Sequence, residues 1–251
     1  MSTALWPFGL LVATSLVFDL TAGVGLHVTL PGRSGFLIGL ALRELLVVLG
    51  VAIVIGRLSR LRLRDFTGPV PEARVWLALP CIALGYLAVE PAVLGPWSAL
   101  LGVTPPSWYE TAVVAPDWQT GLLVGLVLSV TPAVAEEAFF RGTWLTLLDA
   151  RFSRATSSAV QAVGFAAFHL DLFGLPSYLA AGALFAALRR RTASLWPCIA
   201  LHALINALSV LELNRRARGQ ALFEPPTMTT VAMGVVALAG GLWLALRPSR
   251  S

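Results

Sequence analysis

Two adjacent carboxylic acids and an arginine stand near the middle of an otherwise apolar stretch, residues 120–148, TGLLVGLVLSVTPAVAEEAFFRGTWLTLL. On a helix, Glu137 and Arg141 lie one turn apart with the acid nearer the N-terminus, which is the favourable order for an ion pair. Glu136 is rotated by about 100° and has no such local partner. A carboxylate at bilayer depth costs about 3 kcal/mol on insertion scales, so such groups usually face the bundle interior and mark a functional site. The alternative without chemistry is a buried ion-pair network or a helix end.

Two of the three histidines lie in apolar stretches further along the chain. Phe165 precedes His169 by four residues, and His202 precedes Asn206 by four, so the members of each pair share one helix face. A histidine on an apolar helix is more often a hydrogen-bonded packing residue than a base or a ligand. If these helices converge with Glu136, they supply a base, a second titratable group and donors for a developing oxyanion. Amide hydrolysis by an activated water molecule requires such groups.

The helices that must position these groups are apolar along nearly the whole chain. The 251 residues are 57% hydrophobic and 12% charged, with a mean hydropathy of +0.79, which excludes an ordinary water-soluble domain. We therefore expect one integral membrane domain, residues 1–251, folded as an all-α, polytopic bundle of about eight transmembrane helices. The expected helices cover residues 5–30, 35–55, 75–94, 120–148, 157–172, 176–188, 195–211 and 227–246.

Arginine supplies all of the basic side chains other than histidine, since the chain contains no lysine. The arginines gather around residues 57–74, 151–154 and 189–191, so the positive-inside rule predicts that these connections and both termini are cytoplasmic. Arg215, Arg216 and Arg218 depart from the rule, because they fall on the predicted outer side. This distribution is a topology signal, and we expect no nucleic-acid partner. Cys81 and Cys198 are expected to be small core residues without a disulfide.

Charged residues also occur in the first two expected helices. Arg43 and Glu44 are adjacent in sequence, so we expect them not to face one another but to line an internal cavity. With Asp19 they would suit the pathway of a transporter or channel, which is one competing function. A transporter predicts polar residues along a path through the whole bundle, whereas the strongest polar set here is confined to three helices.

The three motifs together resemble those of a known family, the CPBP/Abi intramembrane endopeptidases, which include the Ras-converting CAAX endopeptidases, or CAAX prenyl protease 2. Its pattern is E-E-x-x-x-R, then F-x-x-x-H, then H-x-x-x-N or a variant, on three different helices. The matching residues are Glu136, Glu137 and Arg141, then Phe165 and His169, then His202 and Asn206. The resemblance covers residues 120–211, which we expect to be the catalytic core.

The resemblance implies an intramembrane endopeptidase whose eukaryotic relatives remove the last three residues from prenylated CAAX proteins. Glu136 with His169 would activate the attacking water, while His202 and Asn206 would bind the oxyanion. The residues that hold the site in shape would be Glu137, Arg141 and Phe165. We expect a bacterial or archaeal cell membrane, with the lipid bilayer and a peptide or membrane-anchored protein, prenylated or not, as partners. No cofactor is favoured.

Two alternatives to the glutamate mechanism remain open, a zinc-dependent version of the same protease and a function without catalysis. Zinc is possible, because Glu136, His169 and His202 form a common ligand set and would leave Glu137 free to act as base. Against zinc, the chain has no H-E-x-x-H helix, and Asn206 suits an oxyanion donor better than a ligand. A non-enzymatic immunity or scaffold protein is the other alternative, although a binding scaffold has no chemical need for all of the motif residues.

Overall fold

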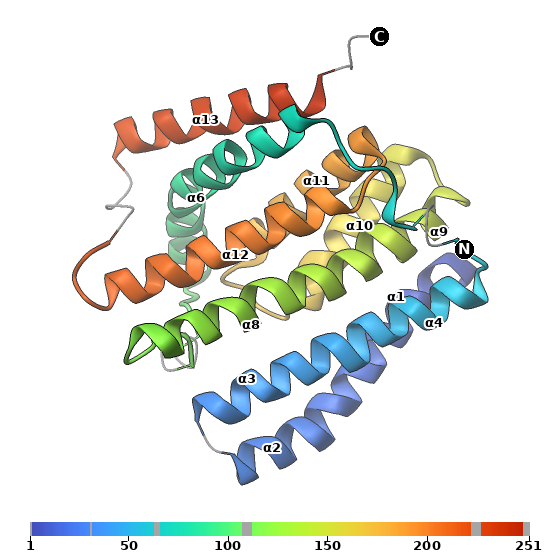
Figure 1. The fold of residues 1–251 in the computed structure, drawn as a ribbon, viewed down its shortest axis with the longest axis horizontal. Coiled ribbons are helices and arrows are strands. Elements are labelled where there is room, and N and C mark those ends of the chain that lie inside the picture. The colour runs from blue at the N-terminus through green and yellow to red at the C-terminus, as the bar shows by residue number, and fades with distance from the viewer. Residues whose placement is uncertain (1, 31, 63–65, 107–111, 222–226, 248–251) are drawn as a thin grey trace.

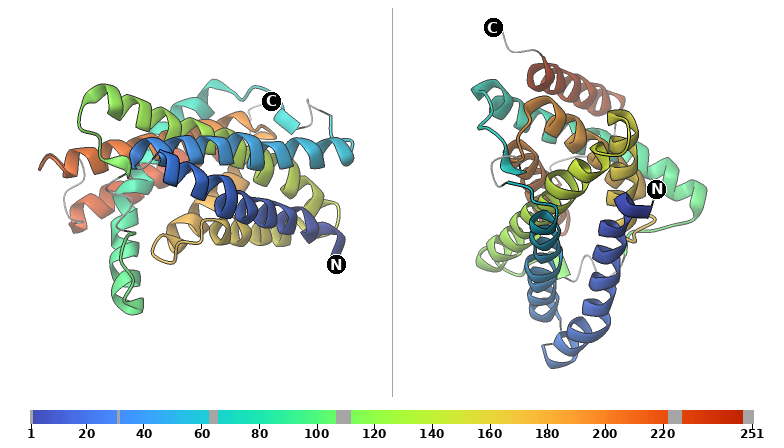
Figure 2. Two further views of the ribbon diagram at one scale, coloured as in Figure 1. Left: turned by 90° about the horizontal axis from the view of Figure 1, so that it is seen from below. Right: turned by 90° about the vertical axis from the view of Figure 1, so that its right-hand side faces the viewer.

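The computed structural model describes residues 2–30, 32–62, 66–106, 112–221 and 227–247. Within these residues the chain forms eight helical stretches of at least 15 residues and no strand, so the predicted all-α bundle is confirmed (Figures 1 and 2). Six of the described helices are long and apolar enough to cross a membrane, as expected of an integral membrane protein. Residues 1 and 248–251 lie outside the described residues. The orientation of the termini therefore stays a prediction.

The N-terminal region is a pair of long helices, each interrupted by one wide, π-helical turn. The first consists of α1 (Ser2–Phe18), η1 (Asp19–Gly23) and α2 (Val24–Thr29). The second consists of α3 (Arg33–Leu42), η2 (Arg43–Val48) and α4 (Leu49–Leu58). This second helix packs along α8 (Trp118–Glu137). The two N-terminal helices together form one flank of the bundle in Figure 1.

The remaining helices form the larger part of the bundle. They are α6 (Ala73–Leu101), then α8 continued by η3 (Ala138–Trp144) and α9 (Leu145–Asp149), then α10 (Arg154–Phe168), α11 (Leu175–Thr192), α12 (Trp196–Arg216) and α13 (Met228–Leu246). Figure 1 shows α8 and α12 side by side in the middle, with α6 and α13 along the side opposite the N-terminal pair. The Asp117 side chain caps α8 by accepting a hydrogen bond from the Thr120 N–H at 2.7 Å, which lowers the pKa of this exposed carboxyl.

Helices α6 and α13 approach closely because glycines lie at their contact. A Cβ on Gly85 would meet the Leu238 nitrogen at 2.4 Å, and a Cβ on Gly241 would meet an Ile82 side-chain carbon at 2.7 Å. Small residues permit such packing in a bilayer, where lipid tails are as apolar as the side chains. Gly85→Ala would force the two backbones apart.

Arg218 has a structural partner, and so does Arg33, which the predicted topology also places on the outer side. Arg33 Nε donates to the Ala112 carbonyl at 3.1 Å, and Arg218 Nη2 donates to the Ala115 carbonyl at 2.9 Å. Asn214 completes the clamp, since its Oδ1 accepts from the Ala115 N–H at 2.8 Å. These side chains satisfy backbone groups of the segment that precedes α8, which gives a structural reason for arginines on this side.

Several expected boundaries were wrong. Helix α6 continues to Leu101 rather than residue 94, although Pro91 and Pro96 lie inside it, and Figure 2 shows its far end turning away from the other helices. The Trp97 side chain holds this end by donating to the Leu172 carbonyl at 2.8 Å. Helix α10 ends at Phe168 rather than residue 172, and α12 continues to Arg216 rather than residue 211.

The expectation for the cysteines was half wrong. Both are free thiols, and Cys198 is buried, but Cys81 is exposed on α6. The apolar surroundings of Cys81 in sequence reflect a helix that crosses the membrane, where an apolar face is suited to lipid as well as to a core.

Candidate active site

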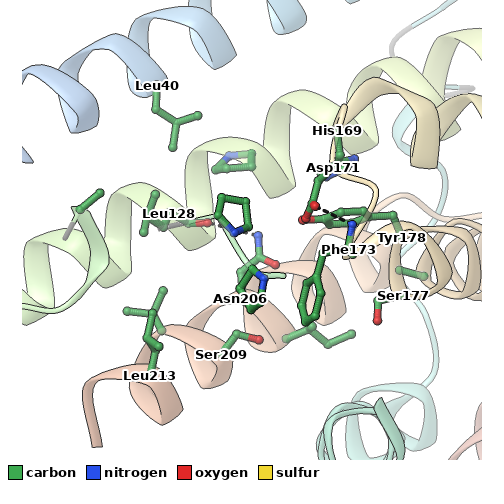
Figure 3. A pocket seen from close by; sticks show the side chains of 18 of the residues that line it. Leu40, Leu128, His169, Asp171, Phe173, Ser177, Tyr178, Asn206, Ser209 and Leu213 are labelled. Atoms are coloured by element: carbon green, nitrogen blue, oxygen red, sulfur yellow. Dashed lines mark hydrogen bonds between the residues drawn. The ribbon is translucent and has the colours of Figure 1, made fainter. Parts of the chain in front are cut away.

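A cavity of about 1430 Å³ lies between the N-terminal helix pair and the larger part of the bundle, lined by residues of α3, η2, α6, α8, α12 and the α10–α11 connection. Five of the predicted site residues line it, namely Glu136, Phe165, His169, His202 and Asn206. Figure 3 shows His169 and Asn206 on the wall of this cavity. The structure thus brings together residues from three separate helical segments, as the chemistry requires.

Glu137 and Arg141 form an ion pair that is completely enclosed. Arg141 Nη1 donates to Glu137 Oε1 at 2.8 Å, and Nη2 donates to the Gly182 carbonyl at 3.2 Å. Both side chains are fully buried. The guanidinium carbon lies 4.3 Å from the ring centre of Phe165 and 4.9 Å from that of Phe185. Aromatic faces and a paired carboxylate therefore replace water around this charge.

His202 joins this pair, which the sequence did not indicate. Its Nδ1 lies 2.9 Å from Glu137 Oε1, the same oxygen that accepts from Arg141. Its ring stacks on Phe185, with the ring centres 5.1 Å apart and the planes at 18°. Because a carboxylate only accepts, Nδ1 carries the hydrogen in this bond. Glu137 thus fixes the orientation of His202, and the opposite ring nitrogen, Nε2, is the one left for the cavity.

Glu136 has a different environment from its neighbour Glu137. It is 5% exposed, and its Oε2 has no hydrogen-bond partner among the described residues. The nearest basic group is Nε2 of His169, at 3.9 Å from this oxygen. A buried carboxylate oxygen without a protein donor is costly. Its position therefore suits a partner that comes and goes during a reaction.

His169 lies at the C-cap of α10, one residue beyond the helix in which it was expected. Its Nδ1 is 2.8 Å from the Phe165 carbonyl oxygen, so Nδ1 carries a hydrogen and the neutral ring presents the lone pair of Nε2 toward Glu136. The next residue, Leu170, has a φ of +50°. Phe165 therefore positions His169 in two ways, because its carbonyl binds Nδ1 and its ring contacts the imidazole.

A side chain from α11 holds the ring of His169 from one side. The Tyr178 ring stacks on it with the centres 3.8 Å apart and the planes at 17°. The Tyr178 hydroxyl lies 3.3 Å from Asp171 Oδ2, and Asp171 Oδ1 accepts from the Phe173 N–H at 2.9 Å (Figure 3). Sequence reasoning missed Tyr178 and Asp171. The only available signal was a tyrosine in the first turn after the short connection that follows His169.

Asn206 lies on the same wall as His202, one helical turn further along α12. Its Nδ2 donates to the Leu128 carbonyl at 3.1 Å, which links α12 to α8 (Figure 3). The amide nitrogen has two hydrogens, so this bond leaves one N–H and the side-chain oxygen for other partners.

Arg43 and Glu44 line the cavity from η2, as predicted, but the expectation that they do not face one another was wrong. Arg43 Nη1 lies 3.3 Å from Glu44 Oε1, and Nε lies 3.5 Å from Asp19 Oδ2. The wide turns at η1 and η2 change the usual helical spacing. Arg43 also lies 4.7 Å from the ring centre of Phe168, the residue before His169.

Glu136, His169 and His202 are the residues that would hold zinc in the alternative site. Within the described ranges, no group of three or more His, Cys, Asp or Glu side chains is placed to hold a metal ion. His202 directs Nδ1 to Glu137, and His169 directs Nδ1 to a carbonyl. Both histidines therefore leave Nε2 for the cavity, an orientation that is open to a hydrogen-bonded site and to a metal ligand alike.

Comparison with known proteins tests the resemblance independently of these contacts. Residues 118–208 match a family described as type II CAAX prenyl endopeptidase Rce1-like. Comparison of the chain with curated proteins and with solved structures gave no match. The matched segment contains all three motifs. The resemblance is therefore confirmed over residues 118–208, which are similar to the Rce1-like type II CAAX prenyl endopeptidases.

Proposed function

We propose that the protein is an intramembrane endopeptidase that hydrolyses a peptide bond with water activated by Glu136 and His169, with residues 120–211 as its catalytic core. The observation that carries the proposal is the unpartnered Oε2 of Glu136, which lies 3.9 Å from the lone-pair nitrogen of His169 at the cavity. A water oxygen at about 2.8 Å from both atoms would make an angle of about 90° with them, close to the angle between the two hydrogens of water.

In this mechanism the water donates one hydrogen to Glu136 and the other to Nε2 of His169. As the water oxygen attacks the carbonyl carbon of the substrate, its proton passes to Glu136 and the carbonyl oxygen becomes an oxyanion. Glu136 then returns this proton to the amide nitrogen, and the C–N bond breaks to give a carboxylic acid and an amine. Glu136 therefore acts first as base and then as acid, while His169 orients the attacking water.

His202 and Asn206 would stabilise the oxyanion from α12. Asn206 supplies the N–H that its bond to Leu128 leaves over. His202 donates through Nε2 when both of its ring nitrogens carry hydrogens, and the Glu137 carboxylate at 2.9 Å from Nδ1 balances the resulting charge. The ion pair with Arg141 holds Glu137 in place for this task.

The substrate class follows from the position of the site. A cavity enclosed by membrane-spanning helices suits a peptide or a membrane-anchored protein, prenylated or not, that reaches it from the bilayer. The cavity wall includes apolar side chains such as Leu40, Leu128 and Phe173 (Figure 3), which would contact an apolar substrate chain. A scaffold has no chemical need for an unpartnered carboxylate beside a histidine, and a transporter would require polar residues along a path through the whole bundle.

The test compares membranes that contain the active protein with membranes that contain Glu136→Gln, by mass spectrometry of peptides and membrane proteins. We expect discrete cleavage products with the active protein only. The same products in both samples would assign the cleavage to another protease, and their absence from both would remove the proposed activity. A product also identifies the substrate and its cleaved bond.

A further inference from the structure

The arginine-rich connections lie together at one end of the helix bundle. The Leu195 N–H donates to the Thr67 carbonyl at 2.7 Å, which joins the connection before α12 to the connection before α6. Arg190 binds Asp149 at 2.8 Å, which joins the end of α11 to the end of α9. Arg191 Nε donates to the carbonyl of the last residue of α13 at 2.6 Å. Under the positive-inside rule this end faces the cytoplasm, and the opposite end faces outward.

The active-site cavity occupies the half of the bundle away from these connections. On α8 its wall runs from Glu136 back to Leu128, and on α12 it runs from His202 on to Arg216. Helix α8 runs toward the arginine-rich end and α12 runs away from it, so both stretches lead from the catalytic groups to the opposite end. Figure 3 shows three of these side chains in order along α12, namely Asn206, Ser209 and Leu213.

The cavity extends to the outer end of the bundle. Its lining includes residues from the start of α3, the connection between α6 and α8, and the end of α12, namely Gly32, Arg33, Pro105, Pro106, Ala112, Val114, Arg216 and Ala217. The predicted topology places all of these segments outside. Among the residues that the structure describes, the lining includes none from the connections 59–72, 150–153 and 193–195.

Fully buried side chains close the cavity toward the arginine-rich end. Phe139, Phe140 and Trp144 of η3 follow the catalytic glutamate along the chain, and each is at most 1% exposed. The Phe140 ring packs edge to face on the Phe165 ring, with the centres 5.1 Å apart. The enclosed guanidinium of Arg141 lies 4.3 Å from the centre of the same Phe165 ring. This buried layer separates the catalytic groups from the arginine-rich end.

We infer that the substrate enters the cavity from the outer face of the membrane, so that the substrate is a peptide or a membrane-anchored segment exposed outside the cytoplasm. The word substrate rests on the proposed hydrolysis, whereas the direction of entry depends only on the shape of the bundle and its orientation. A chain on the outer face would reach Glu136 along the wall of α12. A chain in the cytoplasm would meet the buried aromatic layer instead.

The test labels single cysteines with a thiol reagent that cannot cross a bilayer, in right-side-out and in inverted membrane vesicles. Ser209→Cys reports on the cavity, because Ser209 lines it on α12 one turn beyond Asn206. Ser153→Cys is the matched control, since it makes the same change at an exposed position between α9 and α10. Both changes are made together with Cys81→Ala, while Cys198 is kept because it is fully buried and shielded from the reagent.

We expect right-side-out vesicles to label Ser209→Cys but not Ser153→Cys, and inverted vesicles to give the reverse. Adding Glu136→Gln should leave this pattern unchanged, so the result does not depend on whether the protein hydrolyses peptides. Labelling of both positions from the same side would place the mouth of the cavity at the arginine-rich end. Labelling of Ser209→Cys in inverted vesicles alone would place the mouth in the cytoplasm, and no labelling of it in either preparation would leave only entry from the lipid. Each of these three results would overturn the inference.

Discussion

Glu136 and Glu137 are neighbours in sequence, and each has one buried oxygen without a hydrogen-bond partner among the described residues, but only Glu137 has a second oxygen bound by two donors. The paired cluster, Glu137, Arg141 and His202, is held by hydrogen bonds of 2.8 and 2.9 Å to one carboxylate oxygen. The cavity face, Glu136 and His169, leaves a carboxylate oxygen without a protein partner and a nitrogen 3.9 Å away. The paired cluster is built to stay in one arrangement, and the cavity face is built to exchange partners.

The largest effect on turnover is expected from Glu136→Gln. The amide keeps the size of the side chain but cannot accept and return a proton, so turnover should fall by roughly 10⁴-fold, at the upper end of general acid–base effects. The measurement is the rate of cleavage of the substrate identified by mass spectrometry. The unfolding temperature should change little, because Oε2 has no protein partner to lose. Substantial remaining turnover would transfer the role of base to another group.

Glu137→Gln should reduce stability as well as turnover. It leaves Arg141 buried with a neutral partner, and breaking a buried ion pair costs about 3 kcal/mol. For a chain of this size, that loss corresponds to a fall in unfolding temperature of about 9 °C. The variant should also lose turnover, since Glu137 orients His202. An equal loss of stability in Glu136→Gln and Glu137→Gln would contradict the difference between the two regions.

Asn206→Ala should lower turnover by roughly 100-fold, as loss of an oxyanion donor typically does. The effect should appear in kcat, because the bond to the oxyanion exists only in the transition state. Loss of the hydrogen bond to the Leu128 carbonyl would by itself lower stability rather than kcat. A rise in KM with unchanged kcat would instead make Asn206 a substrate-binding residue.

The sequence predicted the contacts that depend on helical spacing. Glu137 and Arg141 are one turn apart, and they form the expected ion pair at 2.8 Å. The apolar runs likewise predicted the helical bundle, because a membrane allows few alternatives for a chain of this composition. Relations of this kind are local and need no knowledge of packing.

Contacts between distant segments could not be predicted in the same way. His202 meets Glu137 across 65 positions, and Tyr178 reaches His169 only because the connection between them turns α11 back along α10. Spacing along one helix does not contain this information. The motifs indicated which residues matter, whereas packing of the helices decides which ones pair and which are left unpaired.

Tyr178 offers a smaller test of the cavity face. Tyr178→Leu removes the ring stacked at 3.8 Å on His169, so the imidazole should lose part of its orientation. We expect turnover to fall by about tenfold, less than the 10²-fold cost of a 1 Å misplacement. Tyr178→Phe retains the stacking and is the matched control. The pH profile of kcat should shift in Tyr178→Leu relative to Tyr178→Phe. A purely structural role would lower the amount of folded protein without moving that profile.

The smallest effect is expected from a chelator, which should leave turnover unchanged. A catalytic zinc ion lowers the pKa of its bound water to about 7, so a zinc enzyme stripped of metal loses turnover and regains it when zinc is added. In the proposed site, the water is activated by a carboxylate and a histidine, and the oxyanion is stabilised by hydrogen bonds. Elemental analysis of the purified protein should find well under one zinc per chain, with equal cleavage before and after chelation. One zinc per chain whose removal stops cleavage would make Glu136, His169 and His202 metal ligands, and the unpartnered oxygen of Glu136 would then be a ligand atom rather than a base.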